Sequence, residues 1–124
     1  MDDSTRVLVV DDTDHVRRML TTMLSIDGFE VVGAAADGPS AVLECDRLDP
    51  DVVVVDYKMP SMDGLETARQ LKARKPDRHV IVFTAFIDEA LEKDAADIGV
   101  ALCLGKVEGI GALEQEIRHL TGRR

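Results

Sequence analysis

The sequence is poor in aromatic residues and in cysteine. It has no tryptophan, one tyrosine and three phenylalanines in 124 residues, so a buried core must be built from aliphatic side chains. The two cysteines, Cys45 and Cys103, are too far apart in the sequence to form a C-x-x-C metal or redox motif. We interpret both as small buried residues in a reducing compartment.

Basic residues are also in short supply. Fifteen of them stand against 24 acidic residues, which gives a formal net charge of −9. A surface this negative repels nucleic acid and anionic lipid, so we expect neither as a direct partner. No apolar run approaches the roughly 18 residues of a membrane-spanning helix, and the N-terminus lacks the basic start and apolar stretch of a signal peptide. We therefore expect a cytoplasmic protein with one domain, residues 1–124.

Five short apolar runs recur along the chain. Most are rich in β-branched residues and show no alternation with polar residues, which is typical of strands buried on both faces of a parallel sheet. The runs are residues 7–10, 31–36, 52–55, 80–83 and 100–104.

The segments between the runs have helical spacing of apolar residues. Gly28 is a candidate stop for the first helix, the second helix is expected to begin near Pro39 or Ser40, and Asp88 is a candidate N-cap of the fourth. The positions expected to face the core are Val16, Met19, Leu20, Met23, Leu24, Ala41, Val42, Cys45, Leu48, Leu65, Ala68, Leu71, Leu91, Ala95, Ile98, Ile110, Leu113, Ile117 and Leu120.

This alternation predicts an α/β fold of the flavodoxin-like type. Five strand–helix units with right-handed crossovers form a (βα)₅ three-layer sandwich around a five-stranded parallel sheet, in the order 2-1-3-4-5. In such folds ligands bind beyond the carboxyl ends of the strands, where the strand order reverses.

Polar residues gather at those strand ends. The first strand runs into Asp11 and Asp12, the third ends at Asp56, the fourth ends at Thr84, and Lys106 closely follows the fifth. Two carboxylates about 4 Å apart repel by about 4 kcal/mol at an effective dielectric near 20, so three together must take up protons or hold a cation. Oxygen ligands with open positions suit Mg²⁺, and a carboxylate beside Mg²⁺ and a lysine can attack phosphorus to give an aspartyl phosphate.

The motifs around these residues resemble the receiver domains of two-component response regulators. The resemblance rests on residues 9–12, the segment 56–64, the segment 83–85 and Lys106, in that order along essentially the whole chain. It implies that Asp56 accepts a phosphoryl group from a phosphohistidine and that the domain is a switch and not a turnover enzyme.

The same resemblance assigns the remaining roles. Asp12 would be a direct Mg²⁺ ligand, Asp11 would act mainly through a metal-bound water, and the backbone carbonyl of Lys58 would complete the metal site together with Asp56. Lys106 would hold the phosphate and Thr84 would be the switch hydroxyl. The partners implied are a sensor histidine kinase or a phosphotransfer protein, and a downstream protein or fused effector domain. The kinase would contact the exposed side of the first helix, including Thr13, His15 and Arg17. A homodimer formed on phosphorylation is a further option.

Two positions depart from the family pattern. Val107 follows Lys106 where the family often has proline, and Cys103 stands where the family usually has tyrosine or phenylalanine. In the family this aromatic side chain swings inward as the switch threonine moves, and with Cys103 that second movement cannot occur in its ordinary form. Lys58 and Phe86 are expected at the mouth of the site, where they would either hinder an attacking water or point into solvent.

Two other functions fit part of the sequence. Residues 12–16 match the D-x-D-x-[TV] start of haloacid-dehalogenase-type phosphatases, although only Glu108, Glu114 and Glu116 follow Lys106 and they do not form the paired acidic motif of that family. The departures at Cys103 and Val107 instead suggest a receiver-like binding module that ignores phosphate.

Overall fold

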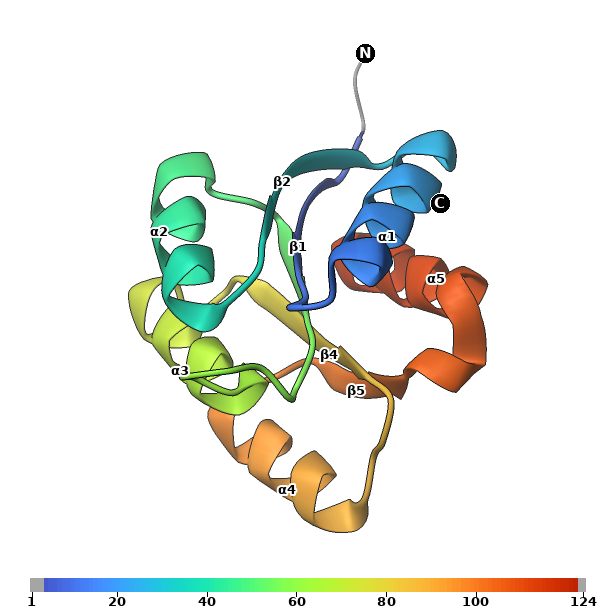
Figure 1. The fold of residues 1–124 in the computed structure, drawn as a ribbon. Helices are drawn as coiled ribbons and strands as arrows, with labels where there is room; N and C mark the ends of the chain where they lie inside the picture. Colours follow the sequence, from blue (N-terminus) through green and yellow to red (C-terminus); the bar gives the residue numbers. More distant parts are fainter. Residues whose placement is uncertain (1–3, 123–124) are drawn as a thin grey trace.

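The computed structural model describes residues 4–122, so the two ends of the predicted domain, residues 1–3 and 123–124, lie outside the described part. Five parallel strands form one sheet in the order β2-β1-β3-β4-β5, and helices alternate with them along the chain (Figure 1). This confirms the predicted fold and strand order. The elements are β1 (Arg6–Val10), α1 (Asp14–Ile26), β2 (Glu30–Ala35), α2 (Gly38–Leu48), β3 (Val52–Val55), α3 (Gly64–Arg74), β4 (His79–Thr84), α4 (Glu89–Ile98), β5 (Leu102–Gly105), the 3₁₀ turn η1 (Lys106–Glu108) and α5 (Gly109–Thr121).

The sheet is buried on both faces, as the unbroken apolar runs predict. All four valines of β3 are buried, and alternate residues of each central strand face opposite layers. Val52 and Val54 pack with α1 and α5 on one face. Val53 and Val55 pack with α2, α3 and α4 on the other face. Figure 1 shows the two groups of helices on opposite sides of the sheet.

Helices α1 and α4 end in the same way. Gly28 and Gly99 have φ values of 101° and 99°, a conformation that glycine adopts without strain. In each case the next residue turns its N–H back to the last turn of the helix: Phe29 bonds to the carbonyl of Leu24, and Val100 bonds to that of Ala95. The candidate stop at Gly28 is therefore confirmed.

Two expectations about the inward-facing segments are wrong. Val100 is buried but lies in the turn between α4, which ends at Ile98, and β5, which begins at Leu102; its N–H bonds back to the last turn of α4. Met19 and Met23 are 48% and 40% exposed, whereas Leu20 and Leu24 are the buried residues of α1 and Val16 packs beside them. Asp88, in contrast, caps α4 as expected and accepts a hydrogen bond from Leu91 N at 2.8 Å.

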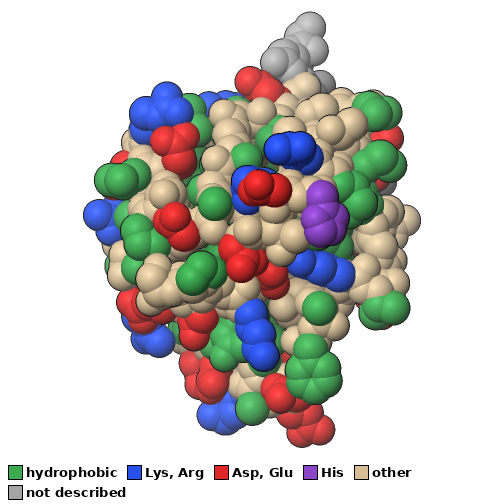
Figure 2. Space-filling model, viewed as in Figure 1, with side chains coloured by type: hydrophobic (Ala, Val, Ile, Leu, Met, Phe, Trp, Pro, Cys, Tyr) green, Lys and Arg blue, Asp and Glu red, His purple; other side chains and the backbone are tan. Residues whose placement is uncertain are grey.

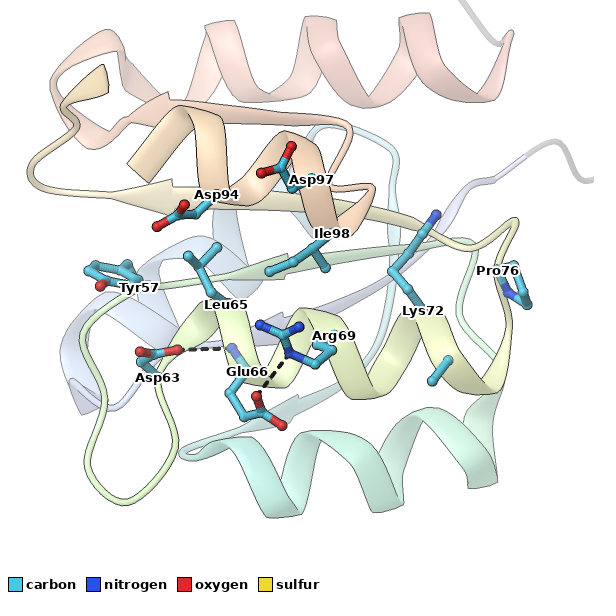
Figure 3. A pocket seen from close by; sticks show the side chains of 11 residues that line it. Tyr57, Asp63, Leu65, Glu66, Arg69, Lys72, Pro76, Asp94, Asp97 and Ile98 are labelled. Carbon is cyan, nitrogen blue, oxygen red and sulfur yellow. Dashed lines mark hydrogen bonds and ion pairs between the residues drawn. The ribbon is translucent and has the colours of Figure 1, made fainter. Parts of the chain in front are cut away.

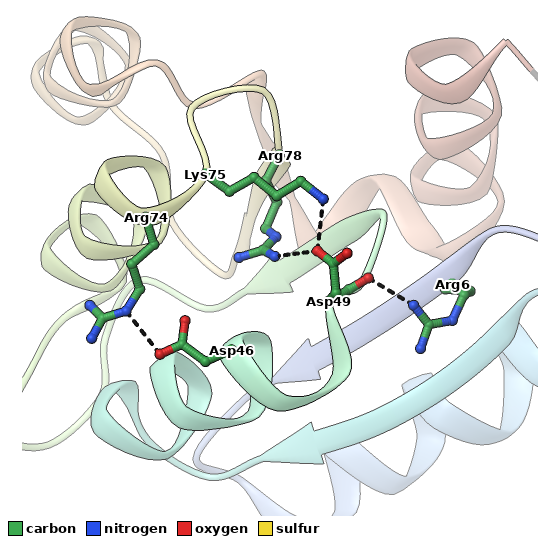
Figure 4. A network of polar contacts seen from close by, with 6 residues as sticks. All are labelled: Arg6, Asp46, Asp49, Arg74, Lys75 and Arg78. Carbon is green, nitrogen blue, oxygen red and sulfur yellow. Dashed lines mark hydrogen bonds and ion pairs between the residues drawn. The ribbon is translucent and has the colours of Figure 1, made fainter.

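A polar network closes the end of the sheet opposite to the predicted site (Figure 4). Asp49, in the turn after α2, accepts hydrogen bonds from Lys75 and Arg78 at 2.7 Å each, and its backbone oxygen accepts one from Arg6 at 2.7 Å. Arg74 pairs with Asp46 at 3.0 Å. These contacts tie the α2–β3 turn to the α3–β4 turn, to the start of β1 and, through Arg74 and Asp46, α3 to α2.

Within residues 4–122, no helix has the length and apolarity needed to cross a bilayer. Acidic and basic side chains are interspersed on the face in Figure 2, and no continuous basic stripe crosses the described part of it.

Candidate functional site

Three carboxylates converge at the carboxyl ends of β1 and β3. One oxygen from each of Asp11, Asp12 and Asp56 lies within 4.8 Å of the others. The backbone brings them together, because β1 and β3 are neighbours and Asp56 N donates to the carbonyl of Val10 at 3.0 Å. Asp11 is buried, Asp56 is largely covered and Asp12 is exposed, so the cluster opens to solvent on the Asp12 side.

Lys106 bridges two of these carboxylates. Its Nζ lies 2.8 Å from Asp11 Oδ2 and 3.3 Å from Asp56 Oδ2. Burial lowers the pKa of Lys106, but the hydrogen bond to Asp11 and the charges of Asp56 and Asp11 outweigh it, so the net pKa is raised. Three carboxylates and one ammonium leave two negative charges uncompensated. That balance, in a set of hard oxygen donors, fits a divalent cation such as Mg²⁺.

A hollow of about 420 Å³ adjoins the cluster. Asp56, Lys58, Thr84 and Phe86 all line it, so the loops after β3 and β4 form its two sides. Thr84 is buried at the end of β4 and pairs with Gly105 of β5. Gly105 directly precedes Lys106, so Thr84 and Lys106 lie at the same end of neighbouring strands. The structure thus brings every predicted site residue to one end of the sheet.

Gly64 fixes the loop that carries Asp56 and Lys58. Its N–H donates to the carbonyl of Tyr57 at 2.7 Å, and a Cβ at this position would lie 2.2 Å from the carbonyl oxygen of Asp56. Only glycine therefore allows α3 to begin directly against the backbone that follows Asp56. The sequence contains a signal for this turn, because Asp63 and Glu66 have the spacing of a helix cap, and Asp63 accepts a hydrogen bond from Glu66 N at 2.9 Å.

Arg17 is a site neighbour whose position the sequence did not indicate. It was expected on the exposed side of the first helix, but its guanidinium turns inward and donates to the carbonyl of Asp11 at 2.7 Å. It also pairs with Asp14, and hydrogen bonding to Arg17 lowers the pKa of that carboxyl. Arg17 thereby fixes the turn that presents Asp11 and Asp12, whereas His15 stays exposed.

The comparisons with known proteins agree with this geometry. The family described as response regulator receiver domain matches residues 7–118. This chain belongs to that family. It is therefore a receiver domain of the two-component response regulators, a regulatory class.

Individual receiver proteins are similar over nearly the whole chain. Response regulator GacA of Pseudomonas protegens is 41% identical over 114 residues, which cover 91% of this chain and 54% of that protein, so the chain spans about half the length of this relative. A LuxR-family response regulator from Aurantimonas superposes with a TM-score of 0.91 at 28% identity, covering 98% of this chain and 89% of the other. CheY of Borrelia burgdorferi, solved with CheX, BeF₃ and Mg²⁺, superposes with a TM-score of 0.89 at 28% identity, covering 94% and 89% of the two chains.

The receiver family and the position of Asp14 argue against the phosphatase alternative. The D-x-D pattern needs Asp14 beside Asp12 in the site, but Asp14 pairs with Arg17 and has a side chain that is 72% exposed. The carboxylates that do converge are those of the receiver motifs.

The two departures from the family pattern lie on either side of Lys106. Cys103 is half-buried on β5 beside the core formed with α2, α3 and α4, and burial raises the pKa of its thiol. Val107 is 88% exposed.

Proposed function

We propose that this receiver domain is switched by phosphorylation of Asp56. The donor is a phosphohistidine on a sensor histidine kinase or a phosphotransfer protein. An Asp56 oxygen forms a bond to phosphorus while the phosphorus–nitrogen bond breaks, and the leaving histidine takes up a proton. The observation that carries this proposal is the convergence of Asp56 with Asp11, Asp12 and Lys106 at one end of the sheet.

We infer that the same cluster holds Mg²⁺. Asp11, Asp12 and Asp56 would supply carboxylate oxygens, and the backbone carbonyl of Lys58 would supply a further ligand. A bound Mg²⁺ would offset the charge that develops on the transferring phosphoryl oxygens. Lys106, whose raised pKa keeps it protonated, is placed to contact the phosphoryl group once it is attached to Asp56.

The output of the switch starts at Thr84 and Lys106. A dianionic group on Asp56 would attract the Thr84 hydroxyl and the Lys106 ammonium, and it would thereby shift an equilibrium between two conformations. Because Cys103 replaces the usual aromatic residue, the movement of Thr84 toward the phosphoryl group would take place without an accompanying aromatic side chain on β5. The partner that binds the shifted surface would be a downstream protein, a fused effector domain or a second copy of the domain.

Labelling with a small phosphodonor tests the proposal. Incubation with acetyl phosphate and Mg²⁺ is expected to attach one phosphoryl group per chain, as read by intact mass spectrometry. The label should disappear without Mg²⁺ and in Asp56→Asn. Asp77→Asn, a change at an exposed residue outside the lining of this site, should label like the wild type. Equal labelling of Asp56→Asn would contradict the assignment, and no labelling of the wild type would favour the phosphate-independent module.

A further inference from the structure

A second hollow lies outside the predicted phosphoacceptor site, between α3 and α4 (Figure 3). Its volume is about 890 Å³, which is within the range of sites that hold ligands or peptide side chains. Leu65 and Ile98 give it an apolar strip between the two helices, and Tyr57 and Pro76 mark its two ends. The hollow is therefore an elongated groove with a length set by α3. We call it the α3–α4 groove.

The two basic residues that line the groove, Arg69 and Lys72, form hydrogen bonds within α3 and the turn that follows it. Arg69 Nε donates to Glu66 at 3.1 Å, and Lys72 Nζ donates to the carbonyl of Arg78 at 3.0 Å. Within residues 4–122, neither cation forms an ion pair with Asp94 or Asp97 on the opposite wall, which belongs to α4.

The α4 wall carries charge that the protein does not compensate. Within residues 4–122, Asp94 has no ion pair or hydrogen-bond partner. Asp97 has only a loose contact of 3.6 Å with Lys93, and both of these side chains are more than two-thirds exposed, so the pair is weak. The groove thus combines an apolar strip with one acidic wall, and the complementary ligand is a cation with an aliphatic portion.

The groove also touches the predicted phosphoacceptor site. Tyr57 and Asp94 line both the α3–α4 groove and the hollow beside Asp56. The backbone N–H of Tyr57 donates to Asp56 Oδ1 at 2.7 Å. An occupant of the groove would therefore rest against the wall that separates it from Asp56.

We propose that the α3–α4 groove docks a short, extended, basic peptide segment of a partner protein. One arginine or lysine of that segment pairs with Asp94 and Asp97, and a neighbouring aliphatic side chain packs on Leu65 and Ile98. Charge complementarity selects a basic segment, and the elongated shape between two helices selects an extended chain. The acidic wall excludes nucleic acid and anionic lipid as occupants. This proposal goes beyond the phosphorylation of Asp56 and does not depend on it.

Titration of the unphosphorylated domain with a defined peptide tests the proposal. The probe is a blocked tetrapeptide of alternating arginine and leucine, and the readout is backbone amide chemical shifts in NMR spectra at physiological salt. We expect saturable shifts at Tyr57, Leu65, Asp94 and Ile98. The same peptide with citrulline in place of arginine keeps the shape and removes the charge, so it should bind at least about fivefold more weakly.

Paired variants separate docking in the groove from general attraction to an acidic protein. The double variant Asp94→Asn/Asp97→Asn should weaken binding by about fivefold. The control Glu89→Gln/Glu92→Gln removes the same charge from exposed positions of the same helix that do not line the groove, and it should change binding by less than about twofold. Equal weakening by both double variants, equal binding of the citrulline peptide, or shifts confined to other surfaces would overturn the proposal. Because no phosphodonor is used, these outcomes are independent of the labelling of Asp56.

Discussion

Glu114 is a buried carboxyl on α5 that faces Asp27 at the end of α1. Burial raises its pKa to about 7, the hydrogen bond and charge of Asp27 act in the same direction, and the charge of Arg118 acts against them. Arg118 stays beside the pair because it donates to the carbonyl of Asp27 at 3.3 Å and lies 4.8 Å over the ring of Phe29. A proton on Glu114 therefore stabilises the contact between α1 and α5.

The stability of the domain should fall as this proton is lost. The folded pKa of Glu114 lies above its ordinary value of 4.5, so the folded state binds the proton more tightly, and this contribution is lost as the pH rises through about 7. Glu114→Gln cannot ionise, so it should not lose this contribution. From pH 5 to pH 8 its free energy of unfolding should therefore rise relative to that of the wild type, by an amount on the order of 2 kcal/mol. Urea unfolding of both proteins at the two pH values measures the difference. A difference that does not change with pH would refute this account of Glu114.

Gly64 is the residue whose replacement should damage the site most directly. In Gly64→Ala the added Cβ would collide with the backbone of Asp56 and Tyr57, so we expect a loss of roughly 1–3 kcal/mol in the free energy of unfolding and slower labelling of Asp56. Gly111→Ala is the matched control, because nothing lies within 4 Å of its added Cβ. It should stabilise α5 by about 0.5–1 kcal/mol and leave labelling unchanged. Similar effects of the two substitutions would contradict the role given to Gly64.

At the scale of elements, the loops after β3 and β4 flank Asp56. Lys58 and Phe86 are exposed, and both line the hollow beside Asp56. If they hinder an attacking water, Lys58→Ala and Phe86→Ala should each shorten the lifetime of the phosphorylated domain several-fold. The decay of label after removal of the phosphodonor measures that lifetime, with Leu43→Ala, an exposed apolar change on α2, as the control. Unchanged lifetimes would mean that both side chains merely point into solvent.

Elements with a complete signal in their own sequence were predicted correctly. β3 is four valines, a run too short for a helix and typical of a fully buried strand, and Asp88 caps α4 as its position before the helix indicated. Errors arose where periodicity does not say how wide a buried face is. The spacing of Met19 and Met23 fits the inner face of α1, but only Leu20 and Leu24 of that helix are buried, with Val16 packed beside them.

The site was predictable as a set of residues but not as a set of contacts. Strand ends place Asp11, Asp56 and Lys106 at one end of the sheet, because parallel strands all end there. The bridge from Lys106 to Asp11 depends on the path of η1, and the inward turn of Arg17 depends on a free carbonyl after β1. Such contacts depend on side-chain conformation, which no pattern of residue types determines.

At the scale of the whole molecule, the candidate site and the network of paired charges lie at opposite ends of the sheet. The carboxylates and Lys106 lie at the carboxyl ends of the strands, and the network of Asp49, Lys75 and Arg78 closes the opposite end. Paired charges hold the closed end together, whereas the site keeps negative charge uncompensated. The charged residues that stabilise the closed end are therefore different from those that form the site.

Mg²⁺ affinity is the most direct test of the central claim that Asp11, Asp12 and Asp56 form a divalent cation site beside Lys106. Tyr57 is the one tyrosine in a chain without tryptophan, and its N–H bonds to Asp56, so its fluorescence reports on the site. We predict saturable binding of one Mg²⁺ by the wild type and affinities at least about tenfold weaker in Asp12→Asn and Asp56→Asn, with Asp77→Asn unchanged. Equal Mg²⁺ affinity in all four proteins would contradict the account.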